Sequence, residues 1–169
     1  MSHLVRSTAA LAGLTIAGIG LAGIQSASAS TPPRCHTSNL KITLPGGSAG
    51  AGQRYADIYF KNISPKTCRT FGWPGLGLAT VHKALSTDTV RIGTAHWVTL
   101  KPGQRAYSAL RWTVIPTGNE NSKGCGPTPT ILRVIPPNET TFKAVHWSGQ
   151  ICGHRTINAY PLHFGTDPH

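Results

Sequence analysis

The segment RYADIYFKN, residues 54–62, alternates apolar and polar side chains at almost every step. In an extended chain successive side chains point to opposite faces, so the apolar residues Ala56, Ile58 and Phe60 would share one face. The polar residues Tyr55, Asp57, Tyr59 and Lys61 would share the other face. A period of two is typical of a strand buried on one side. We therefore expect a half-buried β-strand over residues 54–62.

A second stretch, RAYSALRWTV at residues 105–114, shows the same period. It follows the tetrapeptide KPGQ at residues 101–104, in which Pro and Gly occupy favourable turn positions. The stretch is therefore expected to be a second long strand. Its more apolar face would carry Ala106, Ser108, Leu110, Trp112 and Val114, and its other face Tyr107, Ala109, Arg111 and Thr113.

The rest of the chain is expected to form short strands and turns. Gly or Pro interrupts nearly every window longer than ten residues, and no stretch has a helical period. Seven to nine short antiparallel strands predict an all-β fold, either a β-sandwich or, as the alternative, a small barrel. Pro161 places the last strand at an edge or a bulge. The remaining candidate strands are 39–43, a short one from Cys68, 76–82, 89–92, 96–100, 131–135, 141–145 and 157–164.

Residues 1–29 have the pattern of a secretory signal peptide. A weakly basic start is followed by an apolar run at residues 9–24 and by the small residues Ala27-Ser28-Ala29. We expect cleavage after Ala29, which leaves residues 30–169 as a single β-sandwich domain. Four glycines in the apolar run disfavour a retained transmembrane anchor. The nearest cysteine follows TPPR rather than the cleavage point, so the mature protein is expected to be secreted without a lipid.

The mature part contains an even number of cysteines, which in an oxidising compartment predicts two disulfides. Cys35, Cys68, Cys125 and Cys152 allow three pairings, and their order favours Cys35 with Cys68 and Cys125 with Cys152. A tetrahedral zinc or copper site of Cys125, Cys152, His146 and His154 is the alternative use of the second pair. Its spacing matches no recognised motif, so no metal ligand is predicted.

The chain is strongly basic, with a formal net charge of +11. Loss of Arg6 with the signal peptide leaves fifteen Lys and Arg against five Asp and Glu, a net charge of +10. A field of this sign attracts polyanions, which outside a cell include envelope polymers and acidic lipids. The basic residues are spread singly from Arg34 to Arg155, so a merely solubilising surface is the alternative interpretation.

One strand face combines aromatic and basic side chains and is a candidate binding face. Exposed tyrosines can stack on sugar rings, and basic neighbours would suit an acidic polysaccharide. The alternative is that the second sheet or loops partly cover this face and that the tyrosines are ordinary packing residues. Asp57 on the same face is expected to pair with a cross-strand base such as Arg111. The candidate face consists of Tyr55, Tyr59, Lys61, Tyr107 and Arg111.

No catalytic or cofactor-binding motif is present in the sequence. The chain has no Gly-x-Ser-x-Gly elbow, no His-Glu-x-x-His and no phosphate-binding Gly-rich loop. Its five acids are widely spaced, which disfavours paired-carboxylate catalysis. An even cysteine count argues against a free thiol nucleophile. We therefore predict a protein that is not an enzyme, with no catalytic residue and no cofactor.

Several short motifs occur in a fixed order: GQRY at 52–55, Cys68, GWPG at 72–75, LKPGQRA at 100–106, Trp112, Cys125, Pro136-Pro137 and Cys152. In this order they resemble an actinobacterial secreted family known only as domain of unknown function 4232. The resemblance extends from Cys35 to about Leu162. It implies an immunoglobulin-like sandwich with two disulfides, at the bacterial surface or in the medium. Many members of the family look like lipoproteins, but this chain lacks the lipidation cysteine, so a membrane tether is not carried over.

The family supplies no activity, and the function predicted from the residues is correspondingly general. We expect an extracellular or envelope-associated module that binds an anionic polymer, without specific recognition of nucleic acid. The main alternative is a structural or interaction protein of the cell surface with a protein partner. A metal-binding protein is the third, weaker alternative. The sequence does not indicate the oligomeric state.

Overall fold

The computed structural model describes residues 30–118, 120 and 124–165. The chain divides into two units, Met1–Ser30 and Thr31–His169. The predicted signal peptide and its cleavage point lie outside the described residues. The second unit is built of strands, with one short 3-10 helix, η1 (Thr37–Asn39). Within the described residues, no helix has the length and apolar character needed to span a bilayer.

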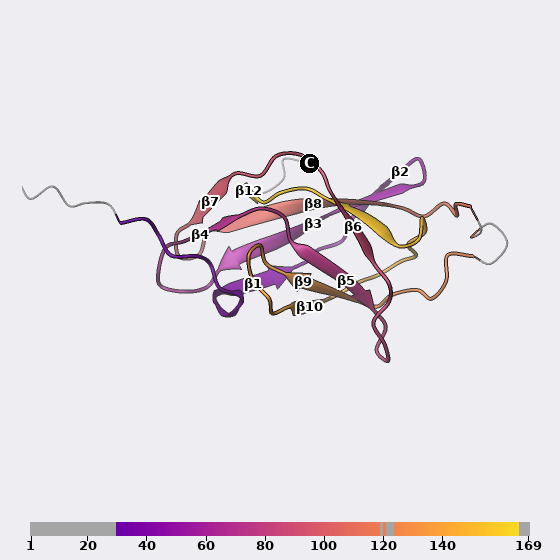
Figure 1. Ribbon diagram of the computed structural model, residues 1–169, viewed down its shortest axis with the longest axis horizontal. Helices are drawn as coiled ribbons and strands as arrows, with labels where there is room; N and C mark the ends of the chain where they lie inside the picture. The colour runs from indigo at the N-terminus through magenta and orange to yellow at the C-terminus, as the bar shows by residue number, and fades with distance from the viewer. Residues whose placement is uncertain (1–29, 119, 121–123, 166–169) are drawn as a thin grey trace, which may run out of the picture. The chain divides into compact units, whose positions relative to one another are not determined.

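The two longest strands are the two predicted from the clearest alternation, and they pair with each other. β3 (Gln53–Asn62) and β8 (Arg105–Thr113) are antiparallel and in register from Gln53 opposite Thr113 to Lys61 opposite Arg105. Figure 1 shows them side by side along the domain. Ile58 and Phe60 are fully buried, as the alternation predicts. The β3–β8 pair is therefore the centre of the fold.

Five further strands extend this pair into a seven-stranded sheet. Its main order is β1-β3-β8-β11-β6, while β2 pairs with β3 and β12 pairs with β8. Most pairs are antiparallel, but β6 and β11 run parallel, which the sequence did not predict. The added strands are β1 (Leu40–Thr43), β2 (Ser48–Gly50), β6 (Asp88–Arg91), β11 (Thr156–Ala159) and β12 (His163–Phe164).

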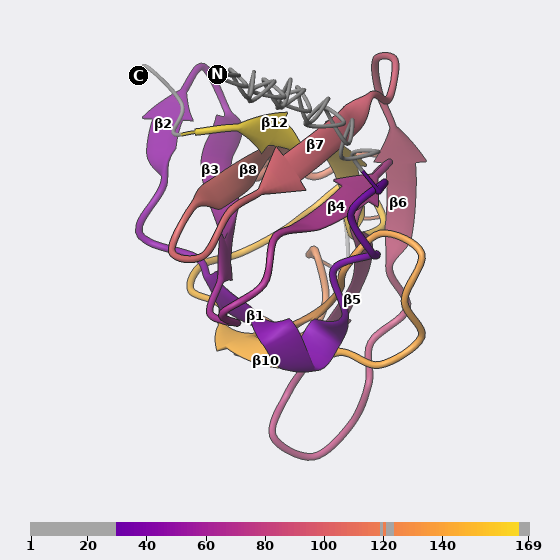
Figure 2. The ribbon, with the colours of Figure 1, turned by 90° about the vertical axis from the view of Figure 1, so that its left-hand side faces the viewer.

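A second layer packs against the core-facing side of the large sheet. It contains the three-stranded sheet β10-β9-β5 and the pair β4-β7. β5 and β9 lie below β3 and β8 in Figure 1, and Figure 2 shows β4 beside β7. Leu78, Leu132 and Val134 of this layer join Ile58 and Phe60 in one buried cluster, which confirms the sandwich. The strands are β4 (Cys68–Phe71), β5 (Gly75–Ala79), β7 (Trp97–Leu100), β9 (Ile131–Ile135) and β10 (Lys143–His146).

The described residues form twelve strands, more than the seven to nine expected, for two local reasons. The Gly-rich segment before β3, for which no strand was predicted, forms β2, whose backbone pairs with the start of β3. The predicted strand over residues 157–164 is split at Pro161, which cannot donate a backbone hydrogen bond. The N–H of Leu162 there bonds to the carbonyl of Gly72, outside the sheet.

Both predicted disulfides are present. Cys35 is joined to Cys68 and Cys125 to Cys152, across sequence separations of 33 and 27 residues. The first ties the segment before β1 to β4. The second ties the long loop after β8 to the segment before β11. Because the sulfur atoms of Cys125 and Cys152 are bonded to each other, the alternative metal site would lack both of its sulfur ligands.

Candidate functional site

The polar side of the β3–β8 pair carries all five residues of the predicted binding face. The register places Tyr59 opposite Tyr107 and Tyr55 opposite Arg111. Lys61 stands opposite Arg105, at the end of the pair. We call this side of the two strands the outer face. The second layer packs on the opposite side of the same strands, so the outer face is not part of the core of the sandwich.

A groove crosses the outer face beside the segment that connects β1 to β2. Its volume is about 720 Å³, within the usual range for ligand pockets. Residues 45–48 form one wall, while Tyr55, Tyr59, Arg111 and Tyr160 contribute from the sheet side. The Tyr55 side chain is 42% exposed and the other two tyrosines are half-buried. Aromatic surface is therefore accessible here at Tyr55, while residues 45–48 partly cover the face.

Rings form a continuous row across the outer face beside the groove. The ring centroids of Tyr59 and Tyr107 are 6.4 Å apart, and those of Tyr107 and His163 are 5.7 Å apart. His96 continues the row, with its ring centroid 4.8 Å from that of His163. The Arg105 guanidinium lies 5.0 Å from the centroid of the Tyr59 ring, a cation–π distance. These contacts hold the rings of Tyr59, Tyr107 and His163 against one another.

A second row, at the end of the pair, consists of cations. Lys41 of β1 stands opposite Lys61 of β3, and Lys61 stands opposite Arg105 of β8. All three side chains are exposed. Like charges directly opposite one another destabilise a sheet. The fold therefore accepts an electrostatic cost at this end of the outer face.

Asp57 is the acidic member of the outer face. The Tyr59 hydroxyl donates a hydrogen bond to its Oδ2 at 3.4 Å. Its direct cross-strand neighbour is Ala109, and Arg111 is a diagonal neighbour two residues further along β8. The expected ion pair with a cross-strand base stays a prediction. Asp57 lines the groove, so it can accept hydrogen bonds from sugar hydroxyls there.

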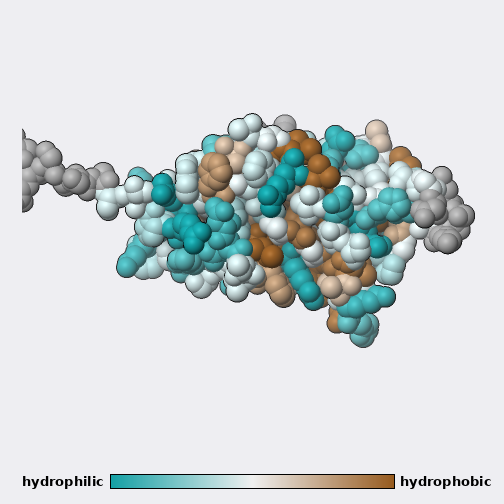
Figure 3. All heavy atoms as spheres, in the orientation of Figure 1, coloured by the Kyte–Doolittle hydropathy of each residue, from teal (hydrophilic) through white to brown (hydrophobic). Residues whose placement is uncertain are grey.

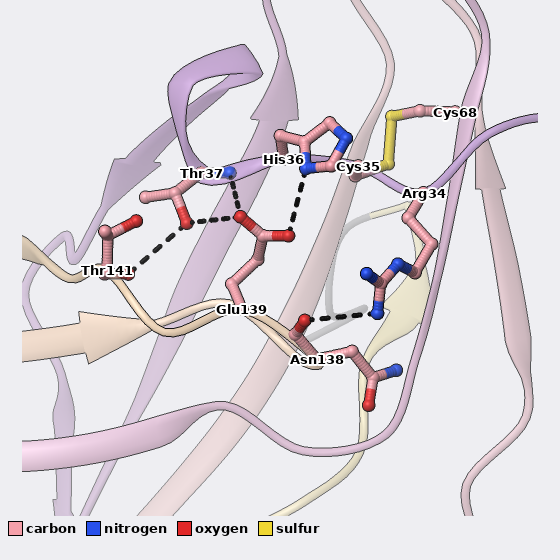
Figure 4. Close-up of polar contacts among 8 residues, drawn as sticks. All are labelled: Arg34, Cys35, His36, Thr37, Cys68, Asn138, Glu139 and Thr141. Atoms are coloured by element: carbon pink, nitrogen blue, oxygen red, sulfur yellow. Dashed lines mark hydrogen bonds and ion pairs between the residues drawn. A yellow bond between two sulfur atoms is a disulfide. The ribbon is translucent and has the colours of Figure 1, made fainter.

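Two of the other carboxylates hold loops in place. Glu139 lies near the Cys35–Cys68 disulfide (Figure 4). It accepts hydrogen bonds from the backbone N–H and the hydroxyl of Thr37, at 2.9 and 3.0 Å, and forms an ion pair with His36 at 3.2 Å. Burial raises the pKa of Glu139, but the Thr37 donors and His36 together outweigh it and leave that pKa below its ordinary value of 4.5.

Glu120 is held in the same way on the long loop after β8. Its carboxylate accepts the backbone N–H groups of Thr117, Gly153 and His154 at 2.8–3.1 Å. Burial raises the pKa of Glu120, but these donors lower it further and the net shift is downward. Within the described residues, the hydrogen-bond partners of both glutamates are backbone N–H groups, two hydroxyls and a histidine, with no lysine or arginine among them.

In residues 30–169, fifteen Lys and Arg outnumber five Asp and Glu. Figure 3, which shows the face seen in Figure 1, has hydrophilic and hydrophobic residues interspersed over most of its area. This pattern agrees with the sequence, in which Lys and Arg are spread singly rather than in blocks. Only the register of the strands brings three of these residues into one row.

Sequence reasoning did not assign Lys41, Arg105 or Tyr160 to the outer face or its groove. Lys41 could have been placed by alternation, because Leu40 and Ile42 beside it are apolar, but its neighbours follow only from the register. Arg105 was assigned to the strand but not to the face. Tyr160 reaches the groove because the N–H of that residue pairs with the Ala109 carbonyl, next to the break at Pro161. The long-range pairing that positions Tyr160 leaves no local signal.

The sequence contains two His-Trp pairs, His96-Trp97 and His146-Trp147, which differ in burial. Of the two His-Trp pairs, Trp147 is buried and His146 is exposed, as strand alternation requires. Trp97, however, is 50% exposed and lies beside Phe71, at a ring-centroid distance of 5.2 Å. In the part of the chain that the structure describes, no three His, Cys, Asp or Glu side chains are grouped as metal ligands.

Comparison with known proteins gives one match. The sequence model of the family described as Domain of unknown function (DUF4232) matches residues 35–161. These residues include both disulfides, the outer face and the groove. No curated protein and no solved structure matches the chain.

Proposed function

Since the chain belongs to the domain of unknown function 4232 family, whose description assigns no activity, we propose a function from the geometry of the outer face. The protein is a secreted, non-enzymatic module that binds an anionic polymer of the cell envelope. The polymer lies across the outer face, with its sugar rings on the tyrosines and its acidic groups on the basic residues.

The observation that carries the proposal is the cross-strand row of Lys41, Lys61 and Arg105. Three exposed cations side by side repel one another, and an anionic ligand would relieve that repulsion. Each contact with the polymer would also release counterions, which favours binding at low salt. A surface that served solubility alone would gain nothing from placing like charges opposite one another.

The tyrosine groove supports a sugar polymer rather than a simple polyanion. Tyr55 and Tyr59 offer ring faces for stacking, and Asp57 and Arg111 beside them offer an acceptor and donors for hydroxyl and acidic groups. The groove and the cation row share β3 and β8, so a single extended chain can contact both. A globular partner is not needed to explain this arrangement.

Features outside the outer face support the extracellular location and the anionic ligand that we propose. Two formed disulfides are typical of an oxidising compartment, and the signal-peptide pattern of residues 1–29 agrees with export. The excess of basic residues gives an attractive field for any polyanion. The absence of catalytic sequence motifs supports binding without chemistry.

The first experiment measures retention of the mature, oxidised protein on isolated bacterial envelope as the salt concentration is raised. Retention at physiological salt and release at higher salt are expected. Polygalacturonate, polyphosphate and neutral dextran then serve as soluble probes. Polygalacturonate is expected to bind best, because it offers both charge and sugar rings. No retention even at low salt would refute the proposal. If polyphosphate bound as tightly as polygalacturonate, stacking of sugar rings on the tyrosines would not contribute to binding.

Variants locate the site on the outer face. Lys61→Gln and Arg105→Gln are each expected to weaken polygalacturonate binding and to reduce its salt dependence by about one released counterion. Tyr55→Ala should weaken binding with an unchanged salt dependence. Lys83→Gln is the matched control, because Lys83 lies in the turn after β5, in the other layer. Equal losses in Lys83→Gln and Lys61→Gln would mean that only the net charge matters.

A protein partner is the second candidate function, and one observation favours it. Trp97 and Phe71 form an exposed aromatic pair on the β4-β7 sheet, and the Arg69 guanidinium lies 4.0 Å from the Trp97 ring centroid. Trp and Arg are the residues most enriched at binding hot spots. This alternative predicts saturable envelope retention that changes little with salt and is lost in Trp97→Ala. The polymer proposal predicts that Trp97→Ala is retained normally.

A further inference from the structure

The alternation of β3 places a charged residue on the wrong side of the strand. Arg54 shares the core-facing side with Ala56, Ile58 and Phe60. It is half-buried and stands opposite Trp112 of β8. An arginine is rarely turned toward a core unless it meets a partner. The surroundings of Arg54 therefore need an explanation.

Arg54 lines a cavity of about 310 Å³ at one end of the sandwich. The indoles of Trp112 and Trp147 line it as well, with ring centroids 4.6 Å apart, and both side chains are buried. His146, at the end of β10, lines the cavity too. A cavity of this size can hold one small ring compound.

The described residues that line the cavity combine hydrogen-bond donors and apolar surface, and none of them is an acid. Two serines, Ser48 and Ser148, add hydroxyl groups, and the other residues around it are apolar or glycine. Within the described part of the chain, the guanidinium of Arg54 makes one hydrogen bond, from Nη1 to the carbonyl of Gln53 at 3.0 Å. A guanidinium has five N–H donors, so most of them remain for a ligand.

We propose that this cavity binds a small organic carboxylate with a flat apolar body. The carboxylate would accept two parallel hydrogen bonds from Arg54, the pairing for which a guanidinium is best shaped. The flat body would lie against the paired indoles. The cavity shares residues 45–48 and Ala56 with the groove. Its ligand-binding groups differ, because Arg54 comes from the core-facing side of β3, whereas Tyr55 and Tyr59 of the groove come from the opposite side.

The test is an NMR titration of the mature, oxidised protein with benzoate and with its neutral counterpart benzamide. Benzoate is expected to shift the indole N–H signals of Trp112 and Trp147, which line the cavity. The signals of Trp73 and Trp97, which do not line it, should stay in place. Benzamide should cause much smaller shifts at equal concentration. Equal shifts with benzamide, or none with benzoate at tens of millimolar, would overturn the proposal.

Variants then assign the anion to Arg54. Arg54→Gln is expected to weaken benzoate binding at least about tenfold, the usual effect of losing a charge-assisted hydrogen bond. Arg54→Lys keeps the positive charge but cannot form two parallel hydrogen bonds, so its affinity for benzoate should lie between those of Arg54→Gln and the unaltered protein. Arg111→Gln, on the outer face, is the matched control and should bind benzoate normally. Unchanged benzoate binding in both Arg54 variants would overturn the proposal.

The two proposals fail separately. Arg54→Gln should bind polygalacturonate as the unaltered protein does, and Lys61→Gln should bind benzoate normally. A well-dispersed NMR spectrum and a melting temperature near that of the unaltered protein check that each variant is folded. If Arg54→Gln does not fold, Arg54→Lys provides the comparison, with benzoate weaker than in the unaltered protein as the expected result.

Discussion

Asn62 at the end of β3 is the position where we expect a single polar substitution to cost most stability. Its side chain has no exposed surface, although an Asn-x-Ser sequence would ordinarily suggest a surface site. Nδ2 donates to the carbonyls of Lys66 and Leu100 at 2.8 and 2.9 Å. Oδ1 accepts from the N–H and the hydroxyl of Ser64 at 3.0 and 2.8 Å. The amide therefore joins the β3–β4 turn to the end of β7.

Asn62→Ala removes these four hydrogen bonds together. A hydrogen bond contributes about 1 kcal/mol net, and a buried group left unpaired costs about 1–3 kcal/mol. The bond to Leu100 is buried, whereas the groups of Ser64 and Lys66 are nearer solvent and can bind water instead. We expect a loss of about 3 kcal/mol in the free energy of unfolding, a large part of the stability of an ordinary domain.

The measurement is equilibrium unfolding in guanidinium chloride, followed by tryptophan fluorescence with both disulfides intact. Ser64→Ala is the control, because it removes only the hydroxyl; a loss of about 1 kcal/mol is expected. Asn62→Asp keeps the shape but places a carboxylate oxygen against two carbonyls, so at pH 7 it should be at least as unstable as Asn62→Ala. A loss below about 1 kcal/mol in Asn62→Ala would refute the reasoning, since it would mean that water replaces the amide.

Three further results are expected. The pKa of Glu139 is lowered in the folded protein, so its ionised form stabilises the fold. In urea melts, the unaltered protein should be more stable than Glu139→Gln above pH 4.5, and this difference should disappear as the pH falls through the lowered pKa. A difference that grew on acidification would contradict this. Replacing Cys125 and Cys152 by Ser should lower the free energy of unfolding by about 3.5 kcal/mol, because the unfolded chain gains entropy without the disulfide. Calorimetry should therefore show a lower melting temperature. An unchanged melting temperature would mean that the loop is ordered without the bond. Gly47→Ala would place a Cβ against the Tyr55 carbonyl, so it should displace residues 45–48 and weaken the binding of both polygalacturonate and benzoate. Gly46→Ala is the control, because the space around Gly46 is open, and it should leave the binding of both ligands unchanged.

The strands that could be predicted were those with long, regular alternation. β3 and β8 extend over nearly the residues that their sequence patterns indicated, and the buried side of each is the predicted one. β2 was missed because a stretch of Ser, Ala and Gly has no apolar face to show a period. It is a strand only because the backbone of β3 is available beside it. Local propensity is a weak guide where pairing supplies the stabilisation.

The candidate face was only partly predictable for the same reason. Alternation places Tyr55, Tyr59 and Lys61 on one side of a strand, and that is a property of the sequence. The opposition of Lys61 to both Lys41 and Arg105 depends on register across three strands, which no segment specifies alone. The exposure of Trp97 likewise depends on what packs over the β4-β7 sheet.

The class of fold, the two disulfides and the basic character of this chain follow from spacing, count and composition, so they could be predicted from the amino acids. The contacts between side chains could not: the cation row, the groove beside residues 45–48 and the cavity lined by Arg54 all depend on how the strands pair and pack. The physical reason is that periodicity is a local property of the chain, whereas a binding surface is made by residues far apart in sequence. Their positions are set by strand register and by the packing of the two layers.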